Sequence, residues 1–199
     1  MRTFTRVLLA ACLLCGVAPA RAAGVNGAVG ILLYRPLSSD LADVYPLGVG
    51  LAVDLGLVYT PHWNLSVQAS PALAWGEPRH GSLAALPSAE MFTLPAHVVV
   101  QYSLPGGGMR PYAGAGAGLL YAREELSFQG PLGAANRSHA STCFSWTLMA
   151  GLETGTRSTR PFLEAHWQHA GTGSIEDQAE SGVSLATLQL RAGVRTRLK

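Results

Sequence analysis

Residues 47–61, LGVGLAVDLGLVYTP, alternate between large apolar side chains and small ones. The odd positions from Leu47 to Leu57 are all Leu or Val, whereas the even positions are Gly or Ala with one exception, Asp54. A helix would mix these two sets around its circumference, but a β-strand separates them onto opposite faces. The stretch therefore predicts a strand with one apolar face and a second face that carries an ionisable group.

The same alternation recurs along the chain, and turn-forming residues separate the repeats. Short connections at 60–63, 105–111 and 155–161 alternate with long ones at 36–45, 76–90, 124–141 and 171–182. This order is typical of outer-membrane barrels, which have short turns at one end and long loops at the other. The sequence therefore predicts an all-β fold, an eight-stranded antiparallel up-and-down transmembrane β-barrel, with strands near 28–35, 47–61, 63–75, 92–104, 110–122, 143–153, 162–168 and 187–198.

The apolar face of these strands is expected to meet lipid. The other face is mostly Gly, Ala, Ser, Thr and Gln, which would make a poor soluble surface but fits the narrow interior of a small barrel. Aromatic residues on the apolar face also fall into two groups along the strands, as in the girdles at the two membrane interfaces. The predicted girdles are Tyr59, Trp63 and Tyr102 near the short turns, and Trp75, Phe92, Tyr121, Trp146 and Trp167 near the long loops.

Ionisable residues on the small-residue face should then point into the lumen. Buried charges persist only when they are paired and hydrogen-bonded, so we expect a polar network that closes the barrel and fixes strand register. A proton or ligand path is the alternative. The predicted network consists of Asp54, His97, Glu153, Glu164, His166, Arg191 and Arg195.

The N-terminus has the features of a signal peptide. Arg2 and Arg6 precede an apolar stretch at 7–17, and Ala20-Arg21-Ala22 is an A-x-A cleavage site. We therefore assign 1–22 to a signal peptide and 23–199 to the barrel domain; the alternative, a lipoprotein site at Cys12, leaves a shorter apolar core than signal peptides have. The net charge of +2, with no Lys/Arg cluster, argues against a nucleic-acid partner.

Two strand openings, RPYAGAGAG from Arg110 and RPFLEAHW from Arg160, and the C-terminal RAGVRTRLK resemble small outer-membrane barrels. The similar families are the OmpA transmembrane domain, OmpX, OmpW and the lipid A 3-O-deacylases of the PagL type. The resemblance implies a Gram-negative outer membrane, surrounding lipid and lipopolysaccharide, a monomer and no cofactor. The OmpW-like alternative is a narrow channel for small hydrophobic solutes.

The deacylase resemblance implies a His-x-Ser pair near the end of the seventh strand and a carboxylate that orients the imidazole, because a serine becomes nucleophilic only beside a positioned base. Aligning His166 puts Gln168 at the serine position and Glu180 at the acidic one. Aligning His169 puts Gly171 there instead. Since both alignments lack the nucleophile, we expect no enzyme; His166, His169 and Glu180 remain the alternative catalytic set.

Acidic residues gather in the predicted loops, where the simplest interpretation is a solvated surface. A divalent cation bridging lipopolysaccharide phosphates is the alternative, and no metal site is predicted from spacing. Because loops on a rigid scaffold carry recognition, the sequence favours a structural or surface-interaction role for them, with an extracellular ligand that it does not identify. These acids are Asp40, Asp43, Glu77, Glu90, Glu124, Glu125, Glu176, Asp177 and Glu180.

Overall fold

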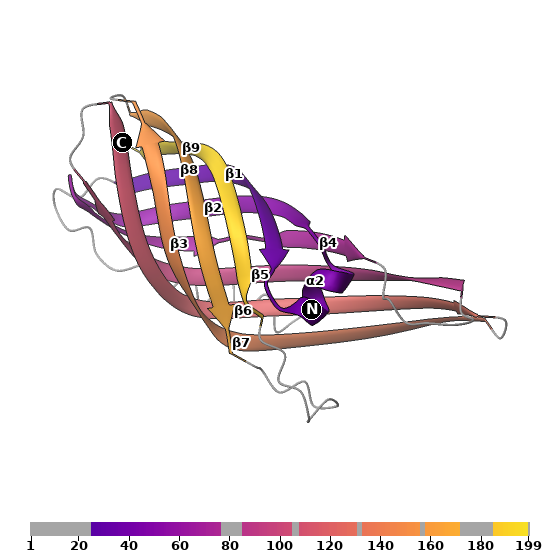
Figure 1. Ribbon diagram of the computed structural model, residues 1–199. Coiled ribbons are helices and arrows are strands. Elements are labelled where there is room, and N and C mark those ends of the chain that lie inside the picture. The colour runs from indigo at the N-terminus through magenta and orange to yellow at the C-terminus, as the bar shows by residue number, and fades with distance from the viewer. Residues whose placement is uncertain are drawn as a thin grey trace.

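The computed structural model describes residues 25–76, 85–104, 108–130, 133–155, 158–171 and 185–198, so the predicted signal peptide lies outside the described residues (Figure 1). The described chain is almost entirely strand, with one short helix between the first two strands. The elements are β1 (Val25–Pro36), α2 (Ser39–Val44), β2 (Gly48–Tyr59), β3 (Trp63–Ala69), β4 (Ala72–Gly76), β5 (Ala85–Ser103), β6 (Met109–Gly130), β7 (Gly133–Thr154), β8 (Thr159–Ala170) and β9 (Thr187–Leu198).

Every strand pairs antiparallel with its neighbours, and β1 pairs with both β2 and β9. β3 and β4 lie end to end between β2 and β5, so together they make up one of the eight strands of a closed barrel. The predicted eight-stranded up-and-down barrel is therefore confirmed. We call the end with the connections at 60–62, 104–108 and 155–158 the turn end, and the opposite end the loop end.

Side chains alternate between the outside and the interior as the sequence predicts. In β2, Val49, Leu51 and Val53 are exposed on the outer face, whereas Ala52 and Asp54 are buried inside. The same alternation holds along β7, β8 and β9, and leaves an apolar outer face around the barrel. No helix in the described part of the chain is long and apolar enough to cross a membrane.

A register shift in β2 reverses the alternation at its last residues. Between Gly56 and Val58 one extra residue enters the strand, so Tyr59 pairs with Asn64, whose side chain is buried inside. A bulge of this kind moves all following side chains to the opposite face. Tyr59 therefore lies toward the lumen and not in the outer girdle, which corrects the prediction made from simple parity.

The third strand of the barrel is broken between β3 and β4, at Ser70 and Pro71, where the sequence predicts one continuous strand over 63–75. Proline has no backbone N–H for a sheet ladder, so it is tolerated at an irregularity of this kind. The backbone stays connected there: Leu51 N–H donates to the Pro71 carbonyl at 3.0 Å, and Ser70 N–H donates to the Pro95 carbonyl at 3.1 Å.

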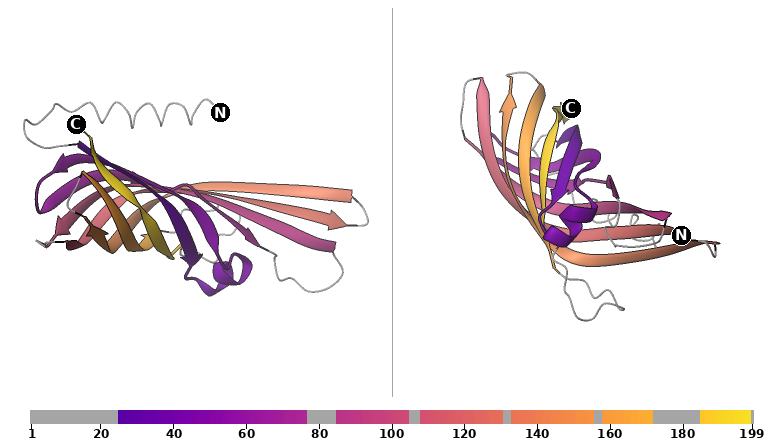
Figure 2. Two further views of the ribbon diagram at one scale, coloured as in Figure 1. Left: turned by 90° about the horizontal axis from the view of Figure 1, so that it is seen from above. Right: turned by 45° about the vertical axis from the view of Figure 1, so that its right-hand side comes forward.

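The loop predicted at 124–141 is wrong, because β6 and β7 continue as a paired ladder from Met109↔Thr154 to Gly130↔Gly133. β5 likewise begins at Ala85, inside the loop predicted at 76–90. Together β5, β6 and β7 extend beyond the other strands as a protruding three-stranded sheet (Figures 1 and 2). We call this part the extension.

Helix α2 and the residues after it pack over the interior at the loop end. Tyr45 is fully buried there, and its Oη donates to Glu124 Oε1 of β6 at 2.7 Å. Leu41 and Val44 pack against the same cluster from α2. The helix therefore joins β1 and β2 to the base of the extension, around a cluster of Leu32, Tyr34, Tyr45, Ala72, Ala74, Ala89 and Met91.

Candidate functional site: the barrel interior

Arg195 of β9 is the centre of the polar interior. Its Nη1 lies 3.1 Å from Glu153 Oε2, and its Nη2 lies 3.0 Å from Glu164 Oε1 and 3.8 Å from Asp54 Oδ2. All four side chains are buried. Three carboxylates from β2, β7 and β8 thus surround one guanidinium, whose planar set of donors suits several carboxylates at once.

The guanidinium of Arg195 also lies between two aromatic rings. Its Cζ is 5.2 Å from the Tyr112 ring centroid and 5.4 Å from that of Phe162, within the range of a cation–π contact. Tyr112 and Phe162 are the aromatic residues of the RPY and RPF strand openings. The two similar motifs therefore supply the two rings around the same cation, a role that the sequence did not reveal.

The arginines of these two motifs meet at the turn end. Arg160 Nη1 lies 2.8 Å from Glu153 Oε1 and donates to Tyr59 Oη at 2.8 Å. Arg110 Nη1 lies 3.6 Å from the same Glu153 oxygen. Neither arginine, nor Tyr59, was among the predicted lumen residues; the matching position of Arg110 and Arg160 before a proline was the available signal.

Arg191 occupies a second, more polar environment in the middle of the barrel. It donates to Gln68 Oε1 at 3.2 Å and to Gln189 Oε1 at 3.1 Å, and its Nη1 is 3.9 Å from Asp54 Oδ1. Gln68 in turn donates to Asp54 Oδ2 at 3.3 Å. Gln68 and Asp54 therefore connect the two buried arginines.

His166 belongs to the same connected set, because its Nε2 lies 2.9 Å from Glu164 Oε2. Tyr112 Oη donates to the other oxygen of that carboxylate at 2.6 Å. The structure thus brings together six of the seven predicted lumen residues: Asp54, Glu153, Glu164, His166, Arg191 and Arg195.

His97 is the seventh, and it has a different partner. Its Nε2 is 2.8 Å from Ser145 Oγ, a pair that joins β5 to β7. A serine beside an imidazole is the arrangement of an activated nucleophile, but the two residues are only 2% and 0% exposed inside the barrel. The pair is therefore sealed from the lipid outside.

The alternative catalytic residues do not form a site in the described chain. His166 is buried inside, and Gln168, at the serine position, accepts a hydrogen bond from Gln189 at 2.6 Å. His169 lies on the outer face with its ring 5.6 Å from that of Trp146, two residues before Gly171. Glu180 lies outside the described residues.

The predicted girdle residues other than Tyr59 lie on the outer face. At the turn end, the Trp63 and Tyr102 rings are 4.8 Å apart. At the loop end, Trp146 and Trp167 meet edge to face at 4.9 Å, and Phe92 and Tyr121 do so at 6.3 Å. Trp75 is 55% exposed on β4. Outward-facing rings at these two levels match the interfaces of a membrane.

Four of the predicted loop acids are described with their side chains: Asp43, Glu90, Glu124 and Glu125. Glu124 bonds to Tyr45, and Glu125 forms an ion pair with Arg123. Within the described ranges, no three His, Cys, Asp or Glu side chains are grouped closely enough to hold a metal ion. The side chain of Asp40, and Glu77, Glu176, Asp177 and Glu180, lie outside the described set.

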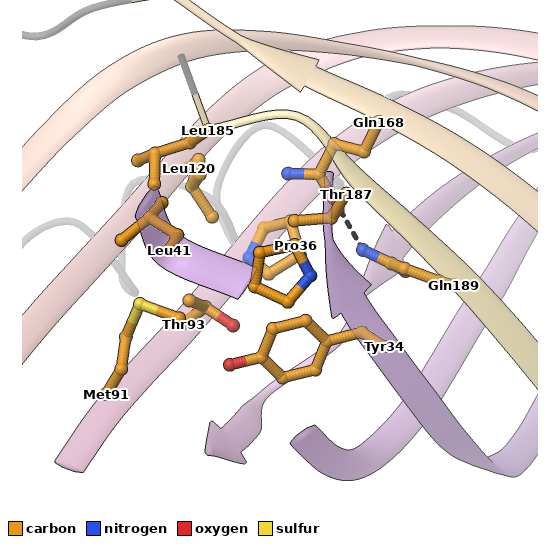
Figure 3. Close-up of a pocket in the computed structure, with 11 residues that line it drawn as sticks. Tyr34, Pro36, Leu41, Met91, Thr93, Leu120, Gln168, Leu185, Thr187 and Gln189 are labelled. Carbon is orange, nitrogen blue, oxygen red and sulfur yellow. Dashed lines mark hydrogen bonds between the residues drawn. The ribbon is translucent and has the colours of Figure 1, made fainter. Parts of the chain in front are cut away.

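A small cavity of about 20 Å³ lies between the polar interior and α2 (Figure 3). Tyr34, Leu41 and Met91 line one part of it, and Gln168 and Gln189 line another. This volume has room for about one water molecule. The interior at the loop end is thus nearly filled by side chains.

Two solved structures are similar to the chain over most of its length. Neisserial surface protein A matches with a TM-score of 0.53 and 13% identity, covering 88% of this chain and 97% of that one. The outer membrane protein OprG from Pseudomonas aeruginosa matches with a TM-score of 0.53 and 15% identity, covering 89% and 96%. The chain has the fold of the small outer-membrane β-barrels. No family model and no curated protein sequence matches it.

This fold, together with the apolar outer face and its two aromatic levels, is that of a protein embedded in a bacterial outer membrane. The expected fold and localisation are confirmed at this level. Likeness at 13–15% identity does not extend to what either protein binds.

Proposed function

We propose that the protein is a non-conducting outer-membrane barrel that supports the extension as a surface-interaction element. The observation that carries this proposal is the length of β6 and β7, which have 22 residues each against 12 in β1, β2, β8 and β9. About 9–11 tilted residues cross a membrane, so the additional residues of β6 and β7 project into the medium. Long paired strands give this projection a defined shape, which a flexible loop would lack.

The interior supports a closed barrel. The arginine–carboxylate network crosses the lumen at the turn end and in the middle, and Tyr34, Tyr45 and Met91 fill it beneath α2. An ion would have to displace paired charges that are costly to separate. We therefore favour this function over a narrow channel for hydrophobic solutes and over a deacylase without its serine.

The test replaces residues 124–139 with Asn-Gly, a favoured two-residue hairpin turn, between the paired residues Arg123 and Ala140. Bacteria that display the full-length chain should adhere to an epithelial monolayer or to one another more than empty-vector cells do. The shortened variant should lose this adhesion, yet still migrate as a folded, heat-modifiable barrel. Equal adhesion by all three strains would contradict the proposal, and steady single-channel openings in a planar bilayer would contradict the closed lumen.

A further inference from the structure

A groove runs along the outer face of the barrel beside the break between β3 and β4. Its volume is about 560 Å³, within the range of small-ligand sites. Gly50, Pro71 and Ala72 form its floor, where the irregular backbone brings β2 and β4 together without large side chains. Its apolar walls are Ile31, Leu33, Val49, Leu51, Leu73 and Phe92.

A second hollow, of about 370 Å³, lies beside this groove toward the loop end. Leu73 and Phe92 line both hollows, so the two are adjacent, and we call them together the combined groove. The second one has a different chemistry, because Tyr121 and three charged residues complete its lining: Glu90, Arg123 and Glu125. The combined groove is thus apolar along the membrane and charged at the interface, as an amphipathic lipid is.

Within the described residues, the charges of the second hollow are not balanced. Glu90 and Glu125 lie directly opposite each other in the β5–β6 ladder, where like charges are destabilising. Arg123 pairs with Glu125, while no described cation forms an ion pair with Glu90. Glu90 therefore has no counter-ion in the described part of the chain, and it lies beside an arginine that keeps further N–H donors for an anion.

We propose that the combined groove binds one phospholipid whose head group carries both a phosphate and a primary ammonium. An acyl chain lies in the apolar part, along β1, β2 and β4. Arg123 donates to the phosphate, as guanidinium groups do to phosphate oxygens, and Glu90 accepts from the ammonium. Tyr121, and Trp75 opposite Glu90 in the β4–β5 ladder, lie at the level where aromatic rings meet lipid head groups.

This site is independent of whatever the extension binds, and lipid retention tests it directly. The full-length chain, purified in a mild detergent, is titrated with phosphatidylethanolamine, phosphatidylglycerol or lipopolysaccharide and examined by native mass spectrometry. We expect one phosphatidylethanolamine to be retained in preference to the other two. Phosphatidylglycerol offers the same phosphate without the ammonium, so it isolates the contribution of Glu90.

Three variants and two controls separate this site from ordinary surrounding lipid. Leu51→Trp fills the apolar part of the groove and should abolish retention of the lipid. Leu148→Trp, which also faces outward but lies on β7 at the opposite side of the barrel, should leave retention unchanged. Arg123→Gln and Glu90→Gln should each weaken retention by roughly fivefold, the value of a partly exposed ion pair. Arg197→Gln, an exposed arginine at the turn end, is the control for charge.

All of these variants change outward-facing or exposed positions, and heat-modifiable migration verifies that each barrel is folded. Equal retention of the three lipids, or equal effects of Leu51→Trp and Leu148→Trp, would overturn the site. Preferential retention of lipopolysaccharide would overturn the assignment of the head group.

Discussion

Arg195 reaches Glu164 diagonally along the lumen and not across the ladder. In the β8–β9 register, Glu164 is opposite Arg191 and Arg195 is opposite Arg160, yet the Arg195 Nη2 to Glu164 Oε1 distance is 3.0 Å. Arg191 turns instead to Gln68 and Gln189. The interior is therefore organised by long side chains that connect different levels of the barrel.

Removing the cation at this centre should destabilise the barrel strongly. Arg195→Met leaves Glu153, Glu164 and Asp54 without their shared partner, and breaking a buried ion pair costs about 3–5 kcal/mol. Urea titration followed by the gel shift between folded and unfolded forms measures the change. The double variant Glu164→Gln with Arg195→Met should recover part of the loss, and a strictly additive result would show that the two residues are not coupled.

Glycine in β6 should be required for close strand packing. A Cβ at Gly118 would overlap the Ala96 carbonyl oxygen of β5, whereas a Cβ at Gly108 would meet nothing within 4 Å. We expect Gly118→Ala to lower the free energy of unfolding by about 1–3 kcal/mol, as overpacking does, and Gly108→Ala to leave it nearly unchanged. Equal urea midpoints for the two variants would contradict this packing.

The contact between α2 and the extension should weaken at high pH. Burial, and then the hydrogen bond to Glu124 and its charge, raise the pKa of the Tyr45 phenol above its ordinary value of 10.0. A raised pKa in the folded state means that the contribution to stability is complete below about pH 10 and is lost as the pH rises beyond it. The urea midpoint of the native chain should therefore fall more between pH 8 and 11 than that of Tyr45→Phe; parallel curves would argue against this role.

The protein should not hydrolyse lipid A. His169 has Gly171 where a serine would be needed, and the buried His166 is bonded to Glu164. Incubation of the purified chain with lipopolysaccharide should release no 3-hydroxy fatty acid above a boiled control. Release that is abolished by His166→Ala or His169→Ala would overturn this expectation.

The sequence predicts the barrel well wherever the two faces differ strongly. In β2 and β8 the contrast between Leu or Val outside and Asp54, Glu164 or His166 inside fixes both strand and orientation. In β6 and β7 beyond Ala122 and Ser141 this contrast disappears, because strands outside the membrane meet water and no longer need an apolar face. The sequence of the extension therefore predicts a loop.

The interior was less predictable than the strands. Parity identifies which side chains point inward, but not which of them touch, since Arg195 and Glu164 are offset along the lumen. Nor does it reveal the β2 bulge that turns Tyr59 toward Arg160, or the pairing of His97 with Ser145 over Gly118 of the strand between them. These contacts depend on register and curvature, which no single strand encodes.

The pairing of β1 with β9 has a consequence for how the cylinder is made. The first and last strands, β1 and β9, are separated by some 160 residues, and each must pair with the other to gain its second neighbour. Until β9 (Thr187–Leu198) has paired, β1 and β8 each have one edge without a neighbouring strand, and the three carboxylates lack Arg195 as their partner. Closure of the barrel and the pairing of its buried carboxylates with Arg195 therefore occur together, because the same strand completes both.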